Sequence, residues 1–356
     1  MSVGERIRQA RKMAQMSQDA LGNKAGVSKQ AISKYELAKD MPGSAVLSQL
    51  AKALGVRVEF FLRRKSALDV QAPAYRRHSR LGAKEQEAIL AEVQEWLERY
   101  LEVESFLPRD EVRSFQFPPN LDRNVHCLEV VEDVAEGVRR AWDLGLDPIE
   151  NLTEVLEDKG IKVRLAEAPD RFDALTMWVN GEVPVIAVNR SFPGDRQRFS
   201  LAHELGHLML KVGPGVDEER AACRFAGAFL VPAAVAHYEL GGGRHTLDAH
   251  ELYLLKQKYG VSMQAWVYRA KDLGIVSESA AQSLFSSFKS SGWYRQEPGE
   301  QLPREEPQRM KRLVMKLLAE DLISESRAAE LLGEPLRRFR DEMVRKYEGR
   351  TVAAGD

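Results

Sequence analysis

The stretch that decides the central fold is RQRFSLAHELGHLML, residues 196–210. Its two histidines, His203 and His207, are four residues apart, so on a helix their imidazoles lie on one face and can share one tetrahedral cation. Glu204 follows the first histidine, where it can take a proton from a metal-bound water rather than bind the metal. Apolar residues on both sides predict a helix with buried faces. The stretch therefore predicts a Zn2+ site with Glu204 as general base, and amide hydrolysis as its chemistry.

The third metal ligand has to come from elsewhere, because a catalytic zinc ion takes three protein ligands and keeps one position for water. The candidates are the acidic residues and histidines that follow the motif: Asp217, Glu218, Glu219, His237, His245 and His250. Glu219 is favoured, because the apolar residues after it recur at helical spacing on its own face. Glu218 and Asp217 fit the acidic first turn of that helix, and His237 is the reserve ligand. A buried helix whose histidines make other hydrogen bonds is the structural alternative.

Residues 3–62 carry the caps and the apolar spacing of five short helices. Ser17 and Ser28 are predicted to cap the second and third helices, and Gly26 allows the turn between them. The outer face of the third helix is polar and suited to a major groove: Ser28, Lys29, Gln30, Ser33 and Lys34. Gln18 opens the second helix, and Lys39 and Arg11 are candidate phosphate contacts. The pattern predicts a DNA-binding domain, with dimerisation or protein binding as the alternative use.

Charge supports this assignment. Residues 1–65 hold 13 Lys and Arg against 5 Asp and Glu, although the whole chain has a net charge of -1. A compact basic segment on a neutral chain predicts a polyanionic partner for that segment. The two cysteines, Cys127 and Cys223, form no paired motif, and no apolar run is long enough for a membrane helix. We therefore expect a cytoplasmic protein with no membrane partner.

The rest of the chain shows a mixed pattern between two helical regions. The charged stretch 63–80 is predicted to be a linker, and 114–123, with its Pro-Pro pair, a second boundary. Helices are expected at 83–103, 131–144, 152–159, 196–210, 218–230 and 248–259, and strands at 161–165, 174–179 and 184–188. The last two strands flank Asn180-Gly181, a hairpin signal. Residues 307–347 are expected to be helical, as a packed hairpin rather than a second helix-turn-helix, with Ser324 as a cap.

Three ordered blocks resemble the ImmA/IrrE family of metallopeptidases over about residues 130–280: RQRFSLAHELGHLML, ERAACRFAGAFLVP and LKQKYGVSMQAWVYRAKDLGI. The resemblance implies a small α+β zincin-like domain, with the two histidines and Glu219 as zinc ligands and Glu204 as base. It also implies cleavage, often under stress, of a helix-turn-helix repressor encoded nearby. Cys223 stands where the family usually has Asn or Asp, which leaves the outer support of a histidine open. Ser262 and Arg269 of the third block also fit an ordinary helix cap and surface cation.

A second resemblance covers residues 3–62. The segment SQDALGNKAGVSKQAISKYELAKDMPGSAVLSQLAKALGV, residues 17–56, resembles the lambda-repressor-like (XRE) helix-turn-helix family. The resemblance implies that Gln18 touches a phosphate and braces the reading helix. Because one such domain reads only a few base pairs, useful affinity suggests a homodimer on double-stranded DNA with a two-fold site.

These patterns predict a multidomain protein. It would have an all-α helix-turn-helix domain over 1–65, a linker and helical connector over 66–128, an α+β zincin-like metallopeptidase domain over 129–280 and an α-helical C-terminal region over 281–356. The expected function is that of a DNA-binding regulator with zinc-dependent endopeptidase activity. It would cleave a peptide or protein substrate, such as a repressor partner or itself, in a stress or mobile-element response. Two other classes stay open: a regulator whose peptidase-like domain only senses zinc or a ligand, and an antitoxin.

Overall fold

The computed structural model describes residues 3–63, 69 and 81–351. Its contacts divide the chain into two compact units. Unit 1 contains the described parts of Met1–Asp69, Arg80–Val112 and Gln308–Asp356, and unit 2 contains Arg113–Pro307. The linker expected over 63–80 lies outside the described residues except for Arg63 and Asp69. The four domain boundaries given above stay a prediction.

The N-terminal part of unit 1 consists of the expected short helices: α1 Val3–Met13, α2 Gln18–Ala25, α3 Lys29–Glu36, α4 Ser44–Leu54 and α5 Val58–Leu62. The hydroxyls of Ser17 and Ser28 accept hydrogen bonds from the backbone N–H groups two residues into α2 and α3. Gly26 ends α2 with φ at 70°, a left-handed conformation that glycine adopts without strain. Its own apolar core, centred on Ile7, Leu21 and Ile32, confirms an all-α helix-turn-helix domain.

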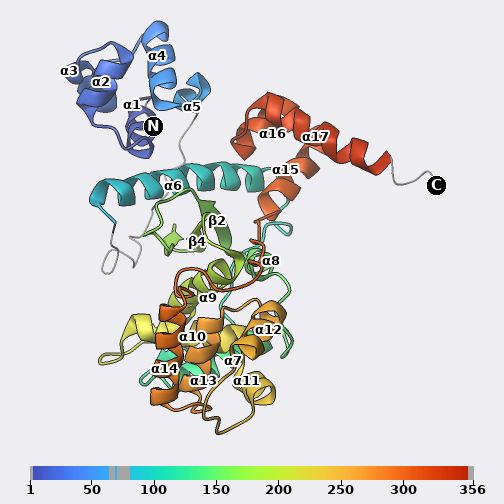
Figure 1. The fold of residues 1–356 in the computed structure, drawn as a ribbon. Helices are drawn as coiled ribbons and strands as arrows, with labels where there is room; N and C mark the ends of the chain where they lie inside the picture. Colours follow the sequence, from blue (N-terminus) through green and yellow to red (C-terminus); the bar gives the residue numbers. More distant parts are fainter. Residues whose placement is uncertain (1–2, 64–68, 70–80, 352–356) are drawn as a thin grey trace. The chain divides into compact units, whose positions relative to one another are not determined.

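The remaining helices of unit 1 are α6 Ala83–Ser105, α15 Arg309–Ala319, α16 Glu325–Leu332 and α17 Leu336–Thr351. The C-terminal segment expected to be helical is thus three helices (Figure 1). Ser324 caps α16 as predicted, and Gly333 ends it in the left-handed conformation with φ at 73°. α1, α15 and α16 all pack against α6, which makes α6 the common support of this unit.

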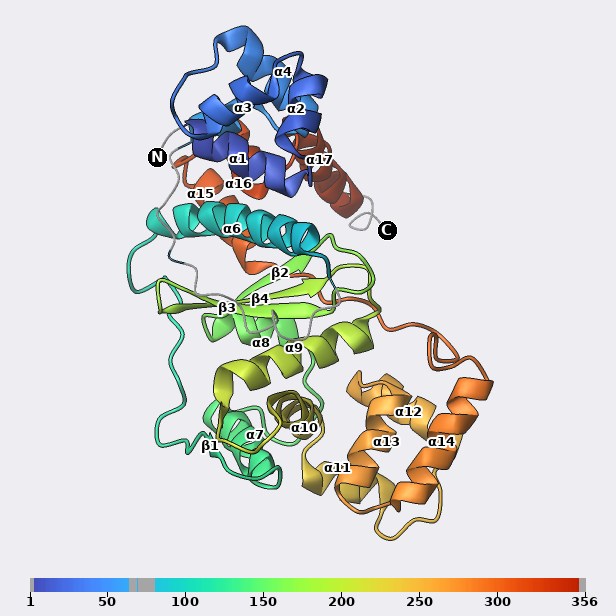
Figure 2. The same ribbon diagram turned by 90° about the vertical axis from the view of Figure 1, so that its left-hand side faces the viewer.

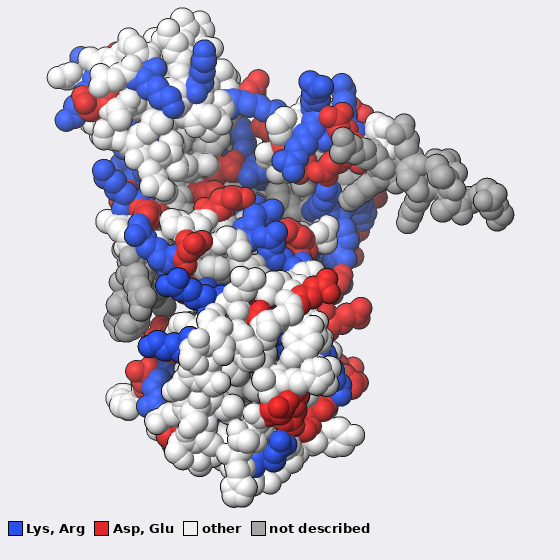
Figure 3. All heavy atoms as spheres, in the orientation of Figure 1, with Lys and Arg blue, Asp and Glu red and all other residues white. Residues whose placement is uncertain are grey.

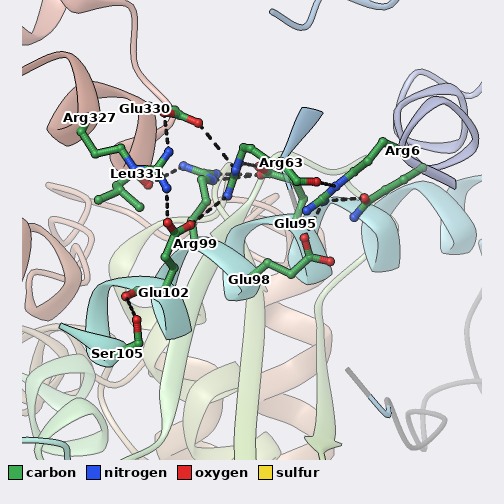
Figure 4. Close-up of polar contacts among 11 residues, drawn as sticks. Arg6, Arg63, Glu95, Glu98, Arg99, Glu102, Ser105, Arg327, Glu330 and Leu331 are labelled. Atoms are coloured by element: carbon green, nitrogen blue, oxygen red, sulfur yellow. Dashed lines mark hydrogen bonds and ion pairs between the residues drawn. The ribbon is translucent and has the colours of Figure 1, made fainter. Parts of the chain in front are cut away.

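A buried ion pair joins α1 to α6 (Figure 4). Arg6 Nη1 donates to Glu98 Oε2 at 2.5 Å and to Gln9 Oε1 at 2.9 Å, and its Nε donates to the carbonyl of Arg63 at 3.3 Å. The Arg6 and Glu98 side chains are only 1% and 3% exposed. Because both charges are removed from water, burying either one depends on the other.

Glu98 belongs to an acidic stripe on α6, which we define as Glu95, Glu98 and Glu102. Their spacing of three and four residues places these carboxylates on one face of the helix. Arg63, directly after α5, donates to Glu95 Oε1 at 3.0 Å and lies 3.8 Å from Glu102 Oε2. It also lies 3.6 Å from Glu330 Oε1 of α16. The acidic stripe therefore receives arginines from both ends of the helix-turn-helix part.

The C-terminal helices contact the same stripe. Arg327 of α16 pairs with Glu102 and with Glu330. Arg99 of α6 donates from Nη1 to the carbonyl of Leu331 at 2.8 Å. The helix-turn-helix part and the C-terminal helices thus both contact α6 through the charged residues of the acidic stripe and its arginine partners.

Unit 2 is built on a three-stranded sheet of β2 Lys162–Ala166, β3 Ala174–Val179 and β4 Val183–Asn189. The strand order is β2-β4-β3, with β2 parallel and β3 antiparallel to β4. Asn180 and Gly181, with φ of 54° and 71°, form the predicted hairpin turn between β3 and β4. β3 is therefore an edge strand of the sheet.

The helices of unit 2 are α7 Val130–Ala141, α8 Leu152–Asp158, α9 Gly194–Met209, α10 Glu218–Leu230, α11 Ala233–Leu240, α12 Ala249–Tyr259, α13 Met263–Asp272 and α14 Glu278–Ser290. α9 packs against β3 and β4 on one side and against α10 on the other (Figure 2). A short parallel pair, β1 Asn124–Val125 with β5 Lys211–Val212, follows the end of α9. The expected α+β fold of this region is confirmed, and α11, β1 and β5 were not predicted.

No single helix in the described ranges is long and apolar enough to cross a membrane. α10 and α11 meet that test only as a pair bent by 64°. Both helices contribute buried residues to the core of unit 2.

The Arg6–Glu98 pair gives a stability prediction. Glu98→Gln leaves the charge of Arg6 buried without its carboxylate, so we expect the free energy of unfolding of unit 1 to fall by about 3 kcal/mol. Hydrogen-exchange mass spectrometry of α1 and α6 peptides in increasing urea measures this for unit 1 alone. Glu325→Gln is the control, because its pair with Arg340 is more than half exposed and should contribute no more than about 0.5 kcal/mol. Equal effects of the two substitutions would contradict the prediction.

Candidate functional site

The helices that carry the candidate ligands approach each other at Gly206. A Cβ at this position would lie 3.2 Å from the Cα of Ala222 and 3.3 Å from its carbonyl oxygen, closer than ordinary contact. The missing side chain thus lets α9 and α10 pack backbone to backbone. This approach places the first turn of α10, with Glu219, beside His203 and His207.

The side-chain donors of these three residues fit one small cation. The Nε2 atoms of His203 and His207 are 3.1 Å apart. The two carboxylate oxygens of Glu219 face them: Oε2 lies 3.3 Å from His203 Nε2, and Oε1 lies 3.6 Å from His207 Nε2. Ligands about 2.0–2.1 Å from a tetrahedral zinc ion are separated by about 3.3–3.4 Å. Among the described residues, these three form the cluster with metal-ligand spacing. The donor set of two imidazoles and one carboxylate is also one that catalytic zinc sites use.

Glu204 lies beside this cluster but outside its donor set. Glu204 is 8% exposed, and the hydroxyl of Thr176 on β3 donates to the backbone carbonyl of Glu204 at 3.3 Å. Burial raises the pKa of its carboxyl, and this effect outweighs the opposing effect of His203 and His207. A carboxyl with a raised pKa is a stronger proton acceptor than an exposed one.

The surroundings of the two histidines are anionic. Burial by itself lowers the pKa of His203, but its contacts with Cys223 and Glu219 and the charge of Glu204 together raise that pKa to about 10. The same negative field that holds a proton there favours a divalent cation. The site is therefore electrostatically matched to a metal ion.

Both histidines have a further neighbour on α10. Cys223 Sγ lies 3.5 Å from His203 Nδ1, and Glu218 Oε1 lies 3.4 Å from His207 Nδ1. The other candidate ligands are not brought to the cluster. Asp217 caps α10 by accepting from the N–H of Arg220, and three histidines are exposed elsewhere in unit 2: His237, His245 and His250.

A second set of charges fixes α10 against its neighbours. Glu132 of α7 accepts from Arg269 of α13 at 2.5 and 2.7 Å and from Arg224 of α10 at 2.5 Å. Ser262 caps α13 as its ordinary interpretation predicts, but the surface position given to Arg269 is wrong. Arg269 is 2% exposed, because it pairs with Glu132 and donates to the carbonyl of Val231 at 2.8 Å. Nothing in the sequence singles out Glu132 from the other acidic residues of α7.

The start of α9 is fixed in the same way. Lys256 of α12 is fully buried and lies 2.9 Å from both Asp195 of α9 and Glu297. The salt bridge of Arg198 with Glu305 joins α9 to the segment before α15. None of these pairs includes a candidate metal ligand; they fix α9, the helix that carries His203 and His207.

The candidate DNA interface is the outer face of α3. Ser28, Lys29, Gln30 and Lys34 are exposed, and Ser33 is half-buried. Charged side chains on the helix-turn-helix part are mostly basic in the view of Figure 3, whereas both signs mix elsewhere on that face. This helix can therefore present its polar side chains to a groove.

Two residues beside α3 have structural partners. Gln18 donates to Glu36 Oε2 at 2.8 Å, which braces α2 against α3 as expected. Arg11 donates to the two oxygens of Glu36 at 2.5 and 2.9 Å and to the carbonyl of Met16. Arg11 therefore pairs with the buried carboxylate of Glu36, and its contact with a phosphate stays a prediction. Lys39 is exposed.

Comparison with known proteins agrees with both parts. Residues 7–61 match the helix-turn-helix family, and residues 156–271 match the peptidase M78 family of IrrE N-terminal-like domains. An uncharacterized HTH-type transcriptional regulator, y4wC of Sinorhizobium fredii, is 44% identical over 59 residues, 17% of this chain and 41% of that protein. An uncharacterized transcriptional regulator in the ATPase CF(0) region of Rhodospirillum rubrum is 39% identical over 59 residues, again 17% of this chain and 55% of that protein. The chain thus matches about half of the length of these relatives.

The crystal structure of ComR from Streptococcus suis aligns with 97% of this chain and 96% of its own, at 11% identity and a TM-score of 0.17. The family matches and the geometry above agree: this chain has a helix-turn-helix domain near its N-terminus, followed over residues 156–271 by a region similar to the IrrE N-terminal-like domains of the peptidase M78 family.

Proposed function

We propose that this chain is a DNA-binding regulator that hydrolyses peptide bonds at a zinc site formed by His203, His207 and Glu219. The observation that carries the proposal is the approach of these donors, beside a buried carboxyl at Glu204. The two Nε2 atoms are 3.1 Å apart, and each lies 3.3–3.6 Å from one oxygen of Glu219. Zinc bound there would supply a water of lowered pKa and polarise the scissile carbonyl.

The residues of the chain divide the work in this proposal. The imidazoles and Glu219 hold the ion, and Glu204 takes the proton of the attacking water and passes it to the leaving amine. Burial raises the pKa of the Glu204 carboxyl, which makes it a stronger proton acceptor than an exposed carboxylate. Arg269, Arg224 and Glu132 act at a distance, by fixing α10.

The edge strand β3 supports a peptide as substrate. β3 ends the strand order of the sheet and packs against α9, and Thr176 in its middle contacts Glu204. An extended peptide can add to such an edge through backbone hydrogen bonds, which bind many sequences alike. The proposed substrate is a helix-turn-helix repressor or the chain itself.

The helix-turn-helix domain supports DNA binding through α3. Gln30, Lys29 and Lys34 are exposed on α3. The hydrogen bond from Gln18 to Glu36 fixes α2 against this helix. Glutamine can pair with adenine in the major groove, whereas lysines attract the backbone phosphates. We propose that α3 enters the major groove of double-stranded DNA and that a homodimer reads a two-fold site.

The peptidase proposal predicts a separation of metal binding from cleavage. Glu204→Gln removes the proton acceptor but no metal ligand, so we expect zinc stoichiometry to be unchanged and cleavage to fall by about 10²–10⁴-fold. The zinc-loaded protein is incubated with repressors encoded near its gene, and products are identified by mass spectrometry. His203→Ala should lose zinc and cleavage together. A cut that persists after chelation of the metal would refute the mechanism.

The cleavage experiment, combined with a measurement of DNA affinity with and without zinc, tests the sensor alternative. A wild-type protein that binds one zinc ion, changes its DNA affinity on binding it and cuts no repressor or part of itself would show that the domain senses the metal. Unchanged cleavage by Glu204→Gln would contradict the proposed role of Glu204 as the general base.

The DNA proposal predicts two different effects on α3. Gln30→Ala should relax base preference at one position at a cost of about 1–3 kcal/mol, because it removes a contact with a base edge. Lys34→Ala should weaken binding to all sequences alike and reduce the slope of log affinity against log salt by about 1. Fluorescence anisotropy with a site that the wild type selects from a random pool measures both. Lys52→Ala, an exposed lysine of α4, is the control, and an equal loss there would contradict the interface.

A further inference from the structure

The two histidines of the cluster each have a second ring nitrogen that faces α10. When Nε2 gives its lone pair to a metal, the neutral imidazole carries its proton on Nδ1. Metal-binding histidines ordinarily donate that proton to an acceptor that fixes the plane of the ring. The acceptors available here decide how firmly His203 and His207 are held.

Cys223 faces the outer nitrogen of His203. Its Sγ lies 3.5 Å from Nδ1, within hydrogen-bonding distance for sulfur. Cys223 follows Glu219 by four residues on α10, so the carboxylate that approaches Nε2 and the sulfur that approaches Nδ1 lie on one face of the helix. The imidazole is therefore enclosed between two groups of a single element.

Glu218 faces the outer nitrogen of His207. Its Oε1 lies 3.4 Å from Nδ1, and that nitrogen is buried without a hydrogen bond among the described residues. A buried N–H without an acceptor costs free energy. The Glu218 side chain is 54% exposed, so it has the freedom to rotate and close the remaining gap.

We infer that Cys223 and Glu218 are positioning residues, which accept the Nδ1 protons of His203 and His207 and hold both rings toward the metal. α10 would thus supply one ligand, Glu219, and the outer support of the other two. This inference rests on the proposed zinc site and adds to it the role of Cys223, where a thiol replaces an oxygen acceptor. It also gives Glu218 a role beyond its place in the first turn of α10.

The test is zinc affinity, measured by competition with a chromophoric chelator on the full chain. Cys223→Ala and Glu218→Ala should each weaken zinc binding by about 10–100-fold. Glu218→Gln keeps an oxygen acceptor and should retain most of the affinity. Cys223→Asp and Cys223→Asn should bind zinc at least as tightly as the wild type, because a thiol is a weaker acceptor than oxygen.

Matched controls separate positioning from a general loss of structure. Cys127→Ala removes the other thiol, and Glu278→Ala removes a first-turn acid from α14, so neither should change zinc affinity. The exposed position of Cys223 predicts that thermal unfolding of the metal-free Cys223→Ala variant matches that of the wild type. Rescue by oxygen acceptors is a result that a purely structural role would not give.

Cobalt substitution distinguishes positioning from direct ligation. The cobalt-loaded wild type should show no thiolate-to-cobalt charge-transfer band, because Cys223 contacts the ring and not the ion. Such a band, or unchanged zinc affinity in Cys223→Ala, would overturn its role, and unchanged affinity in Glu218→Ala would overturn that of Glu218. A wild type that binds no zinc would instead refute the proposed function.

Discussion

The close packing of α9 on α10 is the constraint on which the candidate metal site depends. His203, Glu204 and His207 come from one helix, and Glu219 comes from another, so the site forms only where the two backbones approach within a few ångströms. Gly206 permits that approach, since a Cβ there would meet the backbone of Ala222 at 3.2 Å. The glycine of the HELGH motif is thus as much a part of the site as its histidines, although it contributes no chemistry.

The sequence predicted those features that depend on local spacing. The hairpin at Asn180-Gly181, the caps Ser17, Ser28 and Ser324, and the left-handed end of α2 at Gly26 are each fixed by a few neighbouring residues. The same holds for the pairing of the two histidines, which follows from helix geometry alone. Glu219 lies on a second helix, but it too could be predicted as a ligand. The apolar residues that follow it at helical spacing indicate which face of the helix is buried, and Glu219 lies on that face.

The sequence did not predict where buried charges find their partners. Arg269 and Glu132 are 137 residues apart, and Arg6 and Glu98 are 92 apart, so no local pattern links them. The ion pairs of Arg11 and Arg269 were not predicted for the same reason: an arginine in a sequence gives no sign of a distant carboxylate. The contact of Glu218 with His207 was missed, and the support of a histidine by Cys223 was left open, because both contacts exist only when α10 lies against α9.

These charge pairs differ from the apolar cores in what they specify. The helix-turn-helix part has its own apolar core, which includes Ile7, Leu21 and Ile32. Its contact with α6 instead depends on a buried arginine and a buried glutamate, Arg6 and Glu98, with 1% and 3% exposure. Apolar surfaces tolerate small rotations, whereas a desolvated ion pair loses its compensation when either partner moves. The acidic stripe of α6 therefore specifies the orientation of the helix-turn-helix part on α6 more strictly than apolar packing would. Because α16 binds the same stripe through Arg327, the C-terminal helices are part of what sets that orientation.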